Sequence, residues 1–191
     1  MSILATANLV TLAEVKEFVE QKDASKDIVL EYMIDAVSSR FNTFTRRFLR
    51  SAVYTAQKFN GTGEPDFWLP NYPVGTLSLV KEDGLTLALG VDFLSYPYDG
   101  MLLKKDEKLW TTLPQGVEVT YTAGYALADV PSDLKYSSLK QIAFEFWKQK
   151  SKAFGVDSRS YPDGSVTTSV RSNLLKEVED VLFLYRRLKV V

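Results

Sequence analysis

The feature that most constrains this fold is a change of hydrophobic periodicity along the chain. Apolar residues recur at helical spacing near both ends of the 191-residue sequence, whereas the middle alternates between apolar and polar residues. Helices are predicted over residues 12–22 and 27–48, from 131 to about 153, and from about 172 onward. This order indicates an α+β fold in which helices from both ends share one core and the middle forms a sheet.

The N-terminal helices carry boundary signals. Thr11 and Glu14 have the spacing of a capping box, in which each side chain binds the other residue's backbone amide. Ser25 is predicted to be the N-cap of the second helix. The end of that helix is basic, with Arg40, Arg46, Arg47 and Arg50. Positive charge near a helix C-terminus is favourable, so we prefer this interpretation to a binding patch.

Residues 51–128 have the composition of short strands separated by turns. Strands are predicted over 53–59, 67–69, 77–81, 85–89 and 117–122. Together they should form a small antiparallel sheet or an open barrel.

The hairpin between 77–81 and 85–89 allows two registers. A two-residue turn would set Val80 against Leu87, whereas a three-residue loop would set Leu79 against Leu87. The longer loop places four leucines on one face of the hairpin, so we expect that register.

The C-terminal region combines helix with a long loop. The predicted helix starting at 131 has an apolar stripe that includes Ile142, Phe146 and Trp147. Residues 155–171 are rich in Gly, Ser, Thr, Asp and Pro and are predicted to form a loop, and loops of this length are often functional or ordered by a partner. The expected organisation is three parts: N-terminal helices at 1–50, a β-rich insertion at 51–128, and C-terminal helices of the same core at 129–191.

The composition excludes several kinds of active site. The chain has no Cys and no His, so thiolate metal sites, cysteine nucleophiles and histidine bases are absent. Phosphate-binding glycine motifs and a GxSxG nucleophile elbow are also missing. We therefore expect no catalytic residue, no metal and no cofactor, and hence no enzyme. A net charge of -1 argues against a general nucleic-acid binder.

Two groups of residues are each compatible with an alternative function. A carboxylate site for Mg²⁺ or Mn²⁺, or a carboxylate-based hydrolase, would use Asp92, Asp99 and Asp106. Each lies beside turn residues, so a turn role is favoured. Base stacking would use Phe93, Tyr96 and Tyr98. The nearest following cation is Lys104, so sheet packing or a protein interface is favoured for these aromatics.

Short motifs occur in a fixed order over most of the chain. They include LVTLAEVK at 9–16, TRR ending at 47, FNGTG at 59–63, LPNYPV at 69–74, EDG at 82–84, GVDF at 90–93, VTYTAGY at 119–125, VPSDLK at 130–135 and the segment 160–169. As an ordered set they resemble the head–tail connector (adaptor) proteins of tailed bacteriophages. The β segment is longer than in the smallest members of that family.

The resemblance implies a fold and a role. The fold is a connector-type helical bundle, formed by the N- and C-terminal helices, with a central antiparallel β insertion. The role is that of a structural virion protein, made in the host cytoplasm, in the neck between head and tail. Such adaptors form a ring, usually a dodecamer, under the portal and extend the DNA channel. Another neck component, such as a stopper or tail-completion protein, is the alternative, and a nucleic-acid-binding module is less favoured.

The implied partners are the portal protein, a stopper or tail-completion protein, and further copies of the chain. Double-stranded DNA would pass through the lumen without sequence-specific binding. No membrane contact is expected, because no positive residue precedes Lys16 and no uncharged stretch is long enough to span a bilayer. The portal or ring interface is expected at Ser160, Tyr161, Asp163, Val166, Arg171, Arg186, Arg187, Val190 and Val191.

Overall fold

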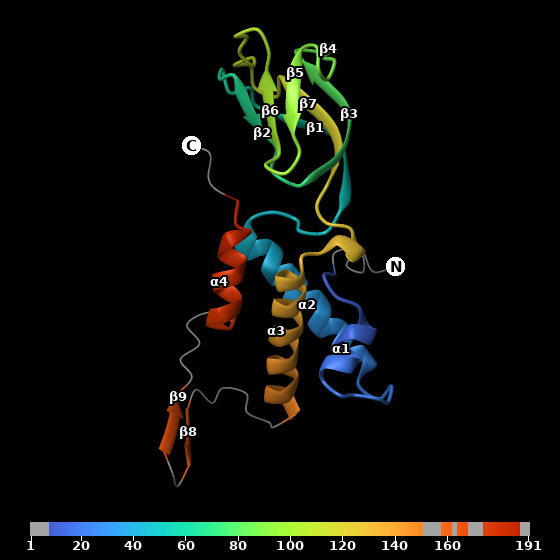
Figure 1. Ribbon diagram of the computed structural model, residues 1–191, viewed down its shortest axis with the longest axis vertical. Coiled ribbons are helices and arrows are strands. Elements are labelled where there is room, and N and C mark those ends of the chain that lie inside the picture. Colours follow the sequence, from blue (N-terminus) through green and yellow to red (C-terminus); the bar gives the residue numbers. More distant parts are fainter. Residues whose placement is uncertain (1–7, 151–157, 162–163, 168–173, 188–191) are drawn as a thin grey trace. The chain divides into compact units, whose positions relative to one another are not determined.

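The computed structural model describes residues 8–150, 158–161, 164–167 and 174–187. Its contacts divide the chain into two compact units (Figure 1). The helical unit comprises Met1–Arg46 and Val130–Arg186, and the β unit comprises Arg47–Asp129 with Arg187–Val191. The expected mixed α+β fold class, with a central β region between helical ends, is confirmed.

Among its described residues, the helical unit contains four helices: α1 (Leu12–Phe18), α2 (Asp27–Thr45), α3 (Ser132–Lys150) and α4 (Lys176–Leu184). Helix α3 packs against each of the others, and α2 also packs against α1 and α4. Figure 1 shows α3 in front of α2, with α4 on one side and α1 on the other. The buried apolar residues of these helices are Val15, Leu30, Ile34, Val37, Phe41, Leu134, Ile142, Phe146, Val178 and Leu182.

The predicted start of α1 is confirmed and that of α2 is wrong. The Glu14 amide donates to Thr11 Oγ1 over 3.2 Å, and the Thr11 amide donates to Glu14 Oε2 over 2.7 Å, which completes the capping box. At α2 the N-cap is Lys26, without a side-chain hydrogen bond. The Ser25 amide instead donates to the Asp23 carboxylate over 2.7 Å, so this segment stabilises the turn before the helix.

The expectation that the arginines near the end of α2 serve its dipole is wrong for Arg40, Arg47 and Arg50. The last turn of α2 holds no basic residue, and Arg46 is the left-handed C-cap with φ 57°. Arg40 pairs with Glu145 of α3 over 2.5 Å. In the β unit, Arg47 donates to the Tyr72 carbonyl over 2.5 Å, and Arg50 donates to the Tyr125 carbonyl over 2.7 Å. These side chains bind particular partners, which outweighs the weak helix-dipole effect.

Two antiparallel sheets form the β unit. Their strands are β1 (Ala52–Phe59), β2 (Asp66–Trp68), β3 (Val74–Glu82), β4 (Leu85–Thr86), β5 (Phe93–Tyr96), β6 (Met101–Lys104) and β7 (Val117–Ala123). One sheet has the order β1-β7-β3-β4 and the other β2-β6-β5. A short 3-10 helix, η2 (Leu127–Asp129), ends the unit. Large aromatic side chains fill its core: Tyr54, Phe67, Phe93, Trp110 and Tyr121.

The expected register of the β3–β4 hairpin is wrong. Glu82 pairs with Leu85, so the turn has two residues, and both Asp83 and Gly84 have positive φ (50° and 83°). Positive φ at both turn positions matches the twist of a hairpin. The pairing of β3 with β7 shifts between Leu77 and Leu79, which is a bulge. A bulge breaks the strict alternation of faces on which the four-leucine argument depended.

Within the predicted loop at 155–171 the backbone forms a hairpin. Strands β8 (Ser158–Tyr161) and β9 (Gly164–Thr167) pair with each other and with no other strand of the described chain. The loop prediction is wrong for these two segments. It rested on overall composition and gave no weight to Tyr161, Val166 and Thr167, which are residue types that favour strands.

Candidate functional site

Few of the predicted interface residues have described side chains. Arg186 and Arg187 do, just after the end of α4. Ser160 and Tyr161 lie in β8 and Val166 in β9, where the backbone alone is described. The remaining ones lie outside the described residues: Asp163, Arg171, Val190 and Val191. The predicted interface therefore stays a prediction, and its described part is the C-terminal end of α4.

Polar contacts fix α4 to α3 near both ends. At its start, the Leu175 amide donates to Gln141 Oε1 over 2.9 Å, and Glu177 forms an ion pair with Lys140. At its end, the Tyr185 hydroxyl lies 2.7 Å from Asp133 Oδ1, to which it donates. Burial of Val178 and Leu182 fixes the helix face between these contacts. Helix α4 is therefore held antiparallel to α3.

The end of α4 combines exposed apolar groups with Arg186, the last residue of the helical unit. Phe183 and Leu184 are 63% and 78% exposed. The Arg186 guanidinium lies 5.9 Å from the centre of the Phe44 ring of α2. Arg187 is half-buried and is grouped with the β unit. Exposed apolar side chains beside cations are a composition found at protein interfaces.

The exposed side of α3 carries aromatic and basic side chains that its predicted apolar stripe did not indicate. The sequence pattern places Trp147 in the buried stripe of this helix, but Trp147 is 47% exposed, and Tyr136 is 55% exposed. Lys140 Nζ lies 5.9 Å from the ring centre of Tyr136, and Lys150 Nζ lies 4.5 Å from that of Trp147. These residues recur at helical spacing on the side of α3 opposite its buried residues. A second stripe of this kind in the sequence could have identified the exposed face.

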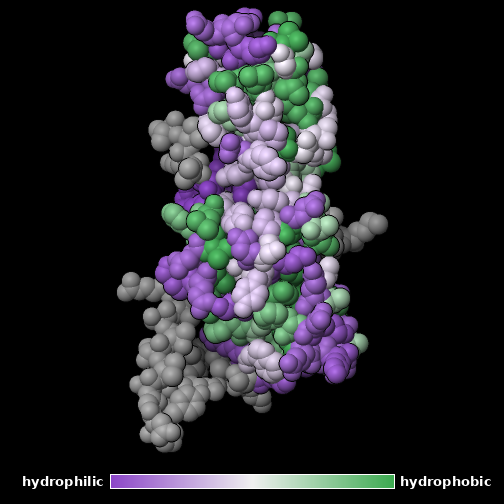
Figure 2. Space-filling view, in the orientation of Figure 1, coloured by the Kyte–Doolittle hydropathy of each residue, from purple (hydrophilic) through white to green (hydrophobic). Residues whose placement is uncertain are grey.

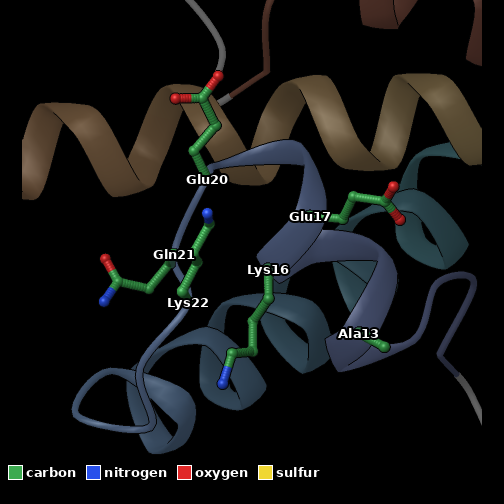
Figure 3. A pocket seen from close by; sticks show the side chains of 6 residues that line it. All are labelled: Ala13, Lys16, Glu17, Glu20, Gln21 and Lys22. Atoms are coloured by element: carbon green, nitrogen blue, oxygen red, sulfur yellow. The ribbon is translucent and has the colours of Figure 1, made fainter.

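A pocket of about 730 Å³ lies beside α1 and the turn that follows it. Its lining is mostly charged or polar: Ala13, Lys16, Glu17, Glu20, Gln21 and Lys22. Figure 3 shows these side chains pointing away from one another instead of converging on one point. Lys16 is already paired with Asp27 over 2.7 Å. We assign no chemistry to this pocket.

The open alternatives for the β unit gain no geometric support. Asp92 accepts the Ala88 amide over 2.7 Å, which confirms its turn role. Phe93 is 1% exposed and belongs to the core, as the packing interpretation expected. In the described part of the chain, no three metal-ligating side chains gather into a cluster. The same residues contain no helix that could cross a membrane.

Exposed apolar residues also gather on the β unit. They lie in β4, in β5 and in the adjacent loops: Leu85, Leu89, Val91, Leu94, Tyr96 and Tyr98. In Figure 2, hydrophobic surface covers the side of the β unit on which Figure 1 labels β4.

Comparisons with known proteins identify the family. The sequence model of the head completion protein family matches residues 8–188. A chain from the neck of an empty gene transfer agent (GTA) particle shares this fold, with a TM-score of 0.58 and 16% identity, covering 100% of this chain and 95% of the other. A chain from the virion of a native GTA particle has a TM-score of 0.58 and 17% identity over the same shares. No curated protein matches the sequence.

The family match extends over both units, from before α1 to beyond α4. The resemblance to connector proteins that the ordered motifs suggested is thereby confirmed at the level of the family. The chain belongs to the head completion protein family.

Proposed function

We propose that this chain is a structural part of the neck of a phage-like particle, where copies of it form a closed ring below the portal. In this role it is an adaptor, which extends the DNA channel toward the tail. The observation that carries the proposal is the family match over residues 8–188. The shared fold with a GTA neck chain is consistent with it.

The composition of the chain fits a structural protein whose role depends on its shape and its contacts with other chains. A closed ring requires one surface patch of each copy to meet a different patch of its neighbour. A lumen that DNA must cross should not retain it, and a net charge of -1 gives little general attraction for phosphates. The absence of Cys and His leaves few candidate nucleophiles or bases, so we propose that the chain has no catalytic centre.

The proposed portal contact is formed by the β8–β9 region and the end of α4. The hairpin pairs with no other strand of the described chain, and an isolated hairpin is marginally stable in water. The α4 end is rigidly placed by its contacts with α3 and presents Phe183 and Leu184 to solvent. Docking on a partner would bury these apolar groups and stabilise the hairpin.

The direct test is to incubate the full chain with purified portal rings and to examine the products by sedimentation and electron microscopy. We expect a coaxial ring on the portal. Deletion of residues 157–168 should abolish this binding without changing the melting temperature. A matched control, Leu109→Ser on the exposed surface of the β unit, should bind normally.

A stopper or tail-completion role is the alternative, and the same experiment separates the two. An adaptor binds the portal directly, whereas a stopper or tail-completion protein binds only after another neck component is present. A chain that ignores bare portal but joins a portal already carrying an adaptor would overturn the adaptor proposal. Unchanged portal binding by the deletion variant would overturn the assigned contact region.

A further inference from the structure

The outward side of α2 is an uncharged stripe. Its exposed residues follow helical spacing along one side of the helix: Ile28, Tyr32, Ala36, Ser39 and Thr43. Ile28 and Tyr32 are 69% and 72% exposed, although they are the largest apolar groups of this stripe. The outward side of a surface helix normally carries charged residues. We call this stripe, with the adjacent Glu31 and Asp35, the α2 face.

The acidic residues of the α2 face lack partners inside the described chain. Among the described residues, neither the Glu31 nor the Asp35 carboxylate forms a hydrogen bond or an ion pair. Both lie in the first half of α2, close to Ile28 and Tyr32. The first half of this face therefore combines an exposed apolar pair with two unneutralised carboxylates.

The outward side of α3 has the opposite charge. It carries the exposed Tyr136, Trp147 and Lys150, flanked by the half-buried Phe144 and Lys148, and we call these residues the α3 face. Lys150 has no carboxylate partner within the described chain. Lys148 and Lys150 lie in the last turn of α3. The second half of this face is therefore aromatic and basic.

The two faces lie on opposite sides of the helical unit. Buried residues of both helices, such as Ile34 of α2 and Ile142 of α3, form the core between them. Figure 1 shows α3 lying in front of α2, so the exposed side of each helix, opposite its buried residues, lies away from the other helix. One chain thus carries two different, complementary faces on opposite sides, which is the arrangement that a head-to-tail ring requires.

The charged ends of the two faces also lie at the same level. Phe44, near the end of α2, contacts Arg186, and the adjacent Tyr185 donates to Asp133 at the start of α3. Figure 1 shows α2 and α3 crossing, with the chain running in opposite directions along the two helices. The start of α2, with its acids, lies at the same end of the unit as the last turn of α3, with its lysines.

We propose that the α3 face of one copy packs against the α2 face of the next copy, with the lysines of the first beside the acids of the second. This inference rests on the ring proposed above and names the surfaces that would close it. Charge complementarity between the two faces, at matching levels, identifies a second copy of this chain as the occupant.

Cross-linking tests the contact, because the natural chain has no cysteine. A variant with both Tyr32→Cys and Trp147→Cys, treated with a short bis-maleimide, should give a ladder of products beyond the dimer. Each single variant should give no product larger than two chains, since one site per copy cannot extend a chain of links. A matched pair on the β unit, Val91→Cys with Leu109→Cys, should give no ladder.

Charge reversal provides the second measurement. Glu31→Lys with Asp35→Lys, and separately Lys148→Glu with Lys150→Glu, should each reduce the ring fraction about tenfold, because like charges then face each other. An equimolar mixture of the two variants should regain rings, since opposite charges again meet at every contact. Failure of the mixture to recover would contradict the proposed pairing.

The outcomes separate this inference from the proposed function. Rings that form while the double variant gives no cross-link between positions 32 and 147 of neighbouring copies would overturn the assigned faces and leave the ring intact. A chain that stays monomeric by sedimentation, with and without portal, would overturn both the ring and the faces.

Discussion

The helical unit and the β unit are stabilised in different ways. In the β unit, Phe67 and Phe93 lie 5.4 Å and 6.1 Å from Trp110 between ring centres, and the ion pair of Lys104 with Glu82 is largely buried beside them. The helical unit instead joins its helices by ion pairs at its surface: Lys16–Asp27, Lys135–Glu14, Arg40–Glu145 and Lys140–Glu177. The β unit also has a surface ion pair, Lys81–Glu118, but it buries one ion pair together with its largest aromatic side chains.

This difference bears on assembly. Surface ion pairs are weak and sensitive to salt, so they can be exchanged for contacts with another chain at small cost. The aromatic side chains in the core of the β unit are buried, so they cannot exchange their contacts for contacts with another chain at small cost. We therefore place the proposed ring contacts on the helical unit and treat the β unit as a rigid body.

The largest effect is expected for Trp110→Ala. Trp110 is 1% exposed and contacts both phenylalanines of the cluster, so its removal should lower the free energy of unfolding by about 3–5 kcal/mol. Chemical denaturation followed by near-UV circular dichroism measures this. The matched control Leu109→Ala removes a side chain that is 59% exposed and should change stability by less than about 0.5 kcal/mol. Similar losses for both variants would show that the cluster is not the core.

The next largest losses of stability are expected from two substitutions that each break one ion pair, one in the β unit and one in the helical unit. Lys104→Ala leaves the largely buried Glu82 without its cation and should cost about 3 kcal/mol, although Glu82 still accepts the Thr111 amide. Lys135→Ala breaks the surface pair with Glu14 and should cost about 1 kcal/mol or less. Raising the salt concentration to about 1 M should reduce the second loss and leave the first almost unchanged. Equal salt dependence of the two losses would remove the contrast between the units.

A smaller effect is expected at the start of α1. Thr11→Ala removes the capping box and should cost about 1 kcal/mol. Burial acts to raise the pKa of Glu14, but hydrogen bonds from Lys135 and Thr11 outweigh it and the pKa is lowered from 4.5. A lowered pKa contributes stability above about pH 4.5 that is lost as the pH falls through the folded-state value.

Acid titration of stability therefore tests the same cap. The natural chain should lose stability below about pH 4.5, and Glu14→Gln should show a smaller loss over this range. Identical acid profiles for the two proteins would contradict the assigned hydrogen bonds of Glu14.

The smallest effect is expected at Tyr54, whose ring stacks on Tyr121 with 5.0 Å between centres. The Tyr54 hydroxyl is buried without a hydrogen-bond partner among the described residues, so Tyr54→Phe should stabilise the protein by up to about 1 kcal/mol. Thermal denaturation at neutral pH checks the sign. A marked loss of stability would show that the hydroxyl does have a partner.

Alkaline titration tests the same side chain. Burial, together with the nearby Tyr121, raises the pKa of Tyr54 from 10 to about 12. Because the unfolded chain loses this proton first, the stability that is present below pH 10 is lost as the pH rises toward 12. Tyr54→Phe should lose less stability than the natural chain over this range.

Local signals in the sequence predicted local structure well. The Thr11 capping box and the turn role of Asp92 could be predicted because each depends on residues at most four positions apart. The order of helices and strands followed from periodicity in the same way. The arginines after Arg40 were misassigned because their partners, such as the Tyr72 and Tyr125 carbonyls, lie far away in the sequence.

Two other failures have a structural cause. The bulge between Leu77 and Leu79 depends on pairing with β7, about forty residues later, so the hairpin sequence alone could not indicate it. The α3 face was missed because an aromatic residue such as Trp147 fits a core stripe and an exposed stripe equally well by composition. Only the packing of α1, α2 and α4 around α3 determines which side of this helix is covered.

Electron microscopy of the full chain mixed with purified portal tests the central claim most directly. We predict a closed ring of many copies, coaxial with the portal and open along its axis, in which each helical unit touches the next. A chain that remains a single copy and leaves the portal bare, or a closed assembly without an axial opening wide enough for duplex DNA, would contradict it.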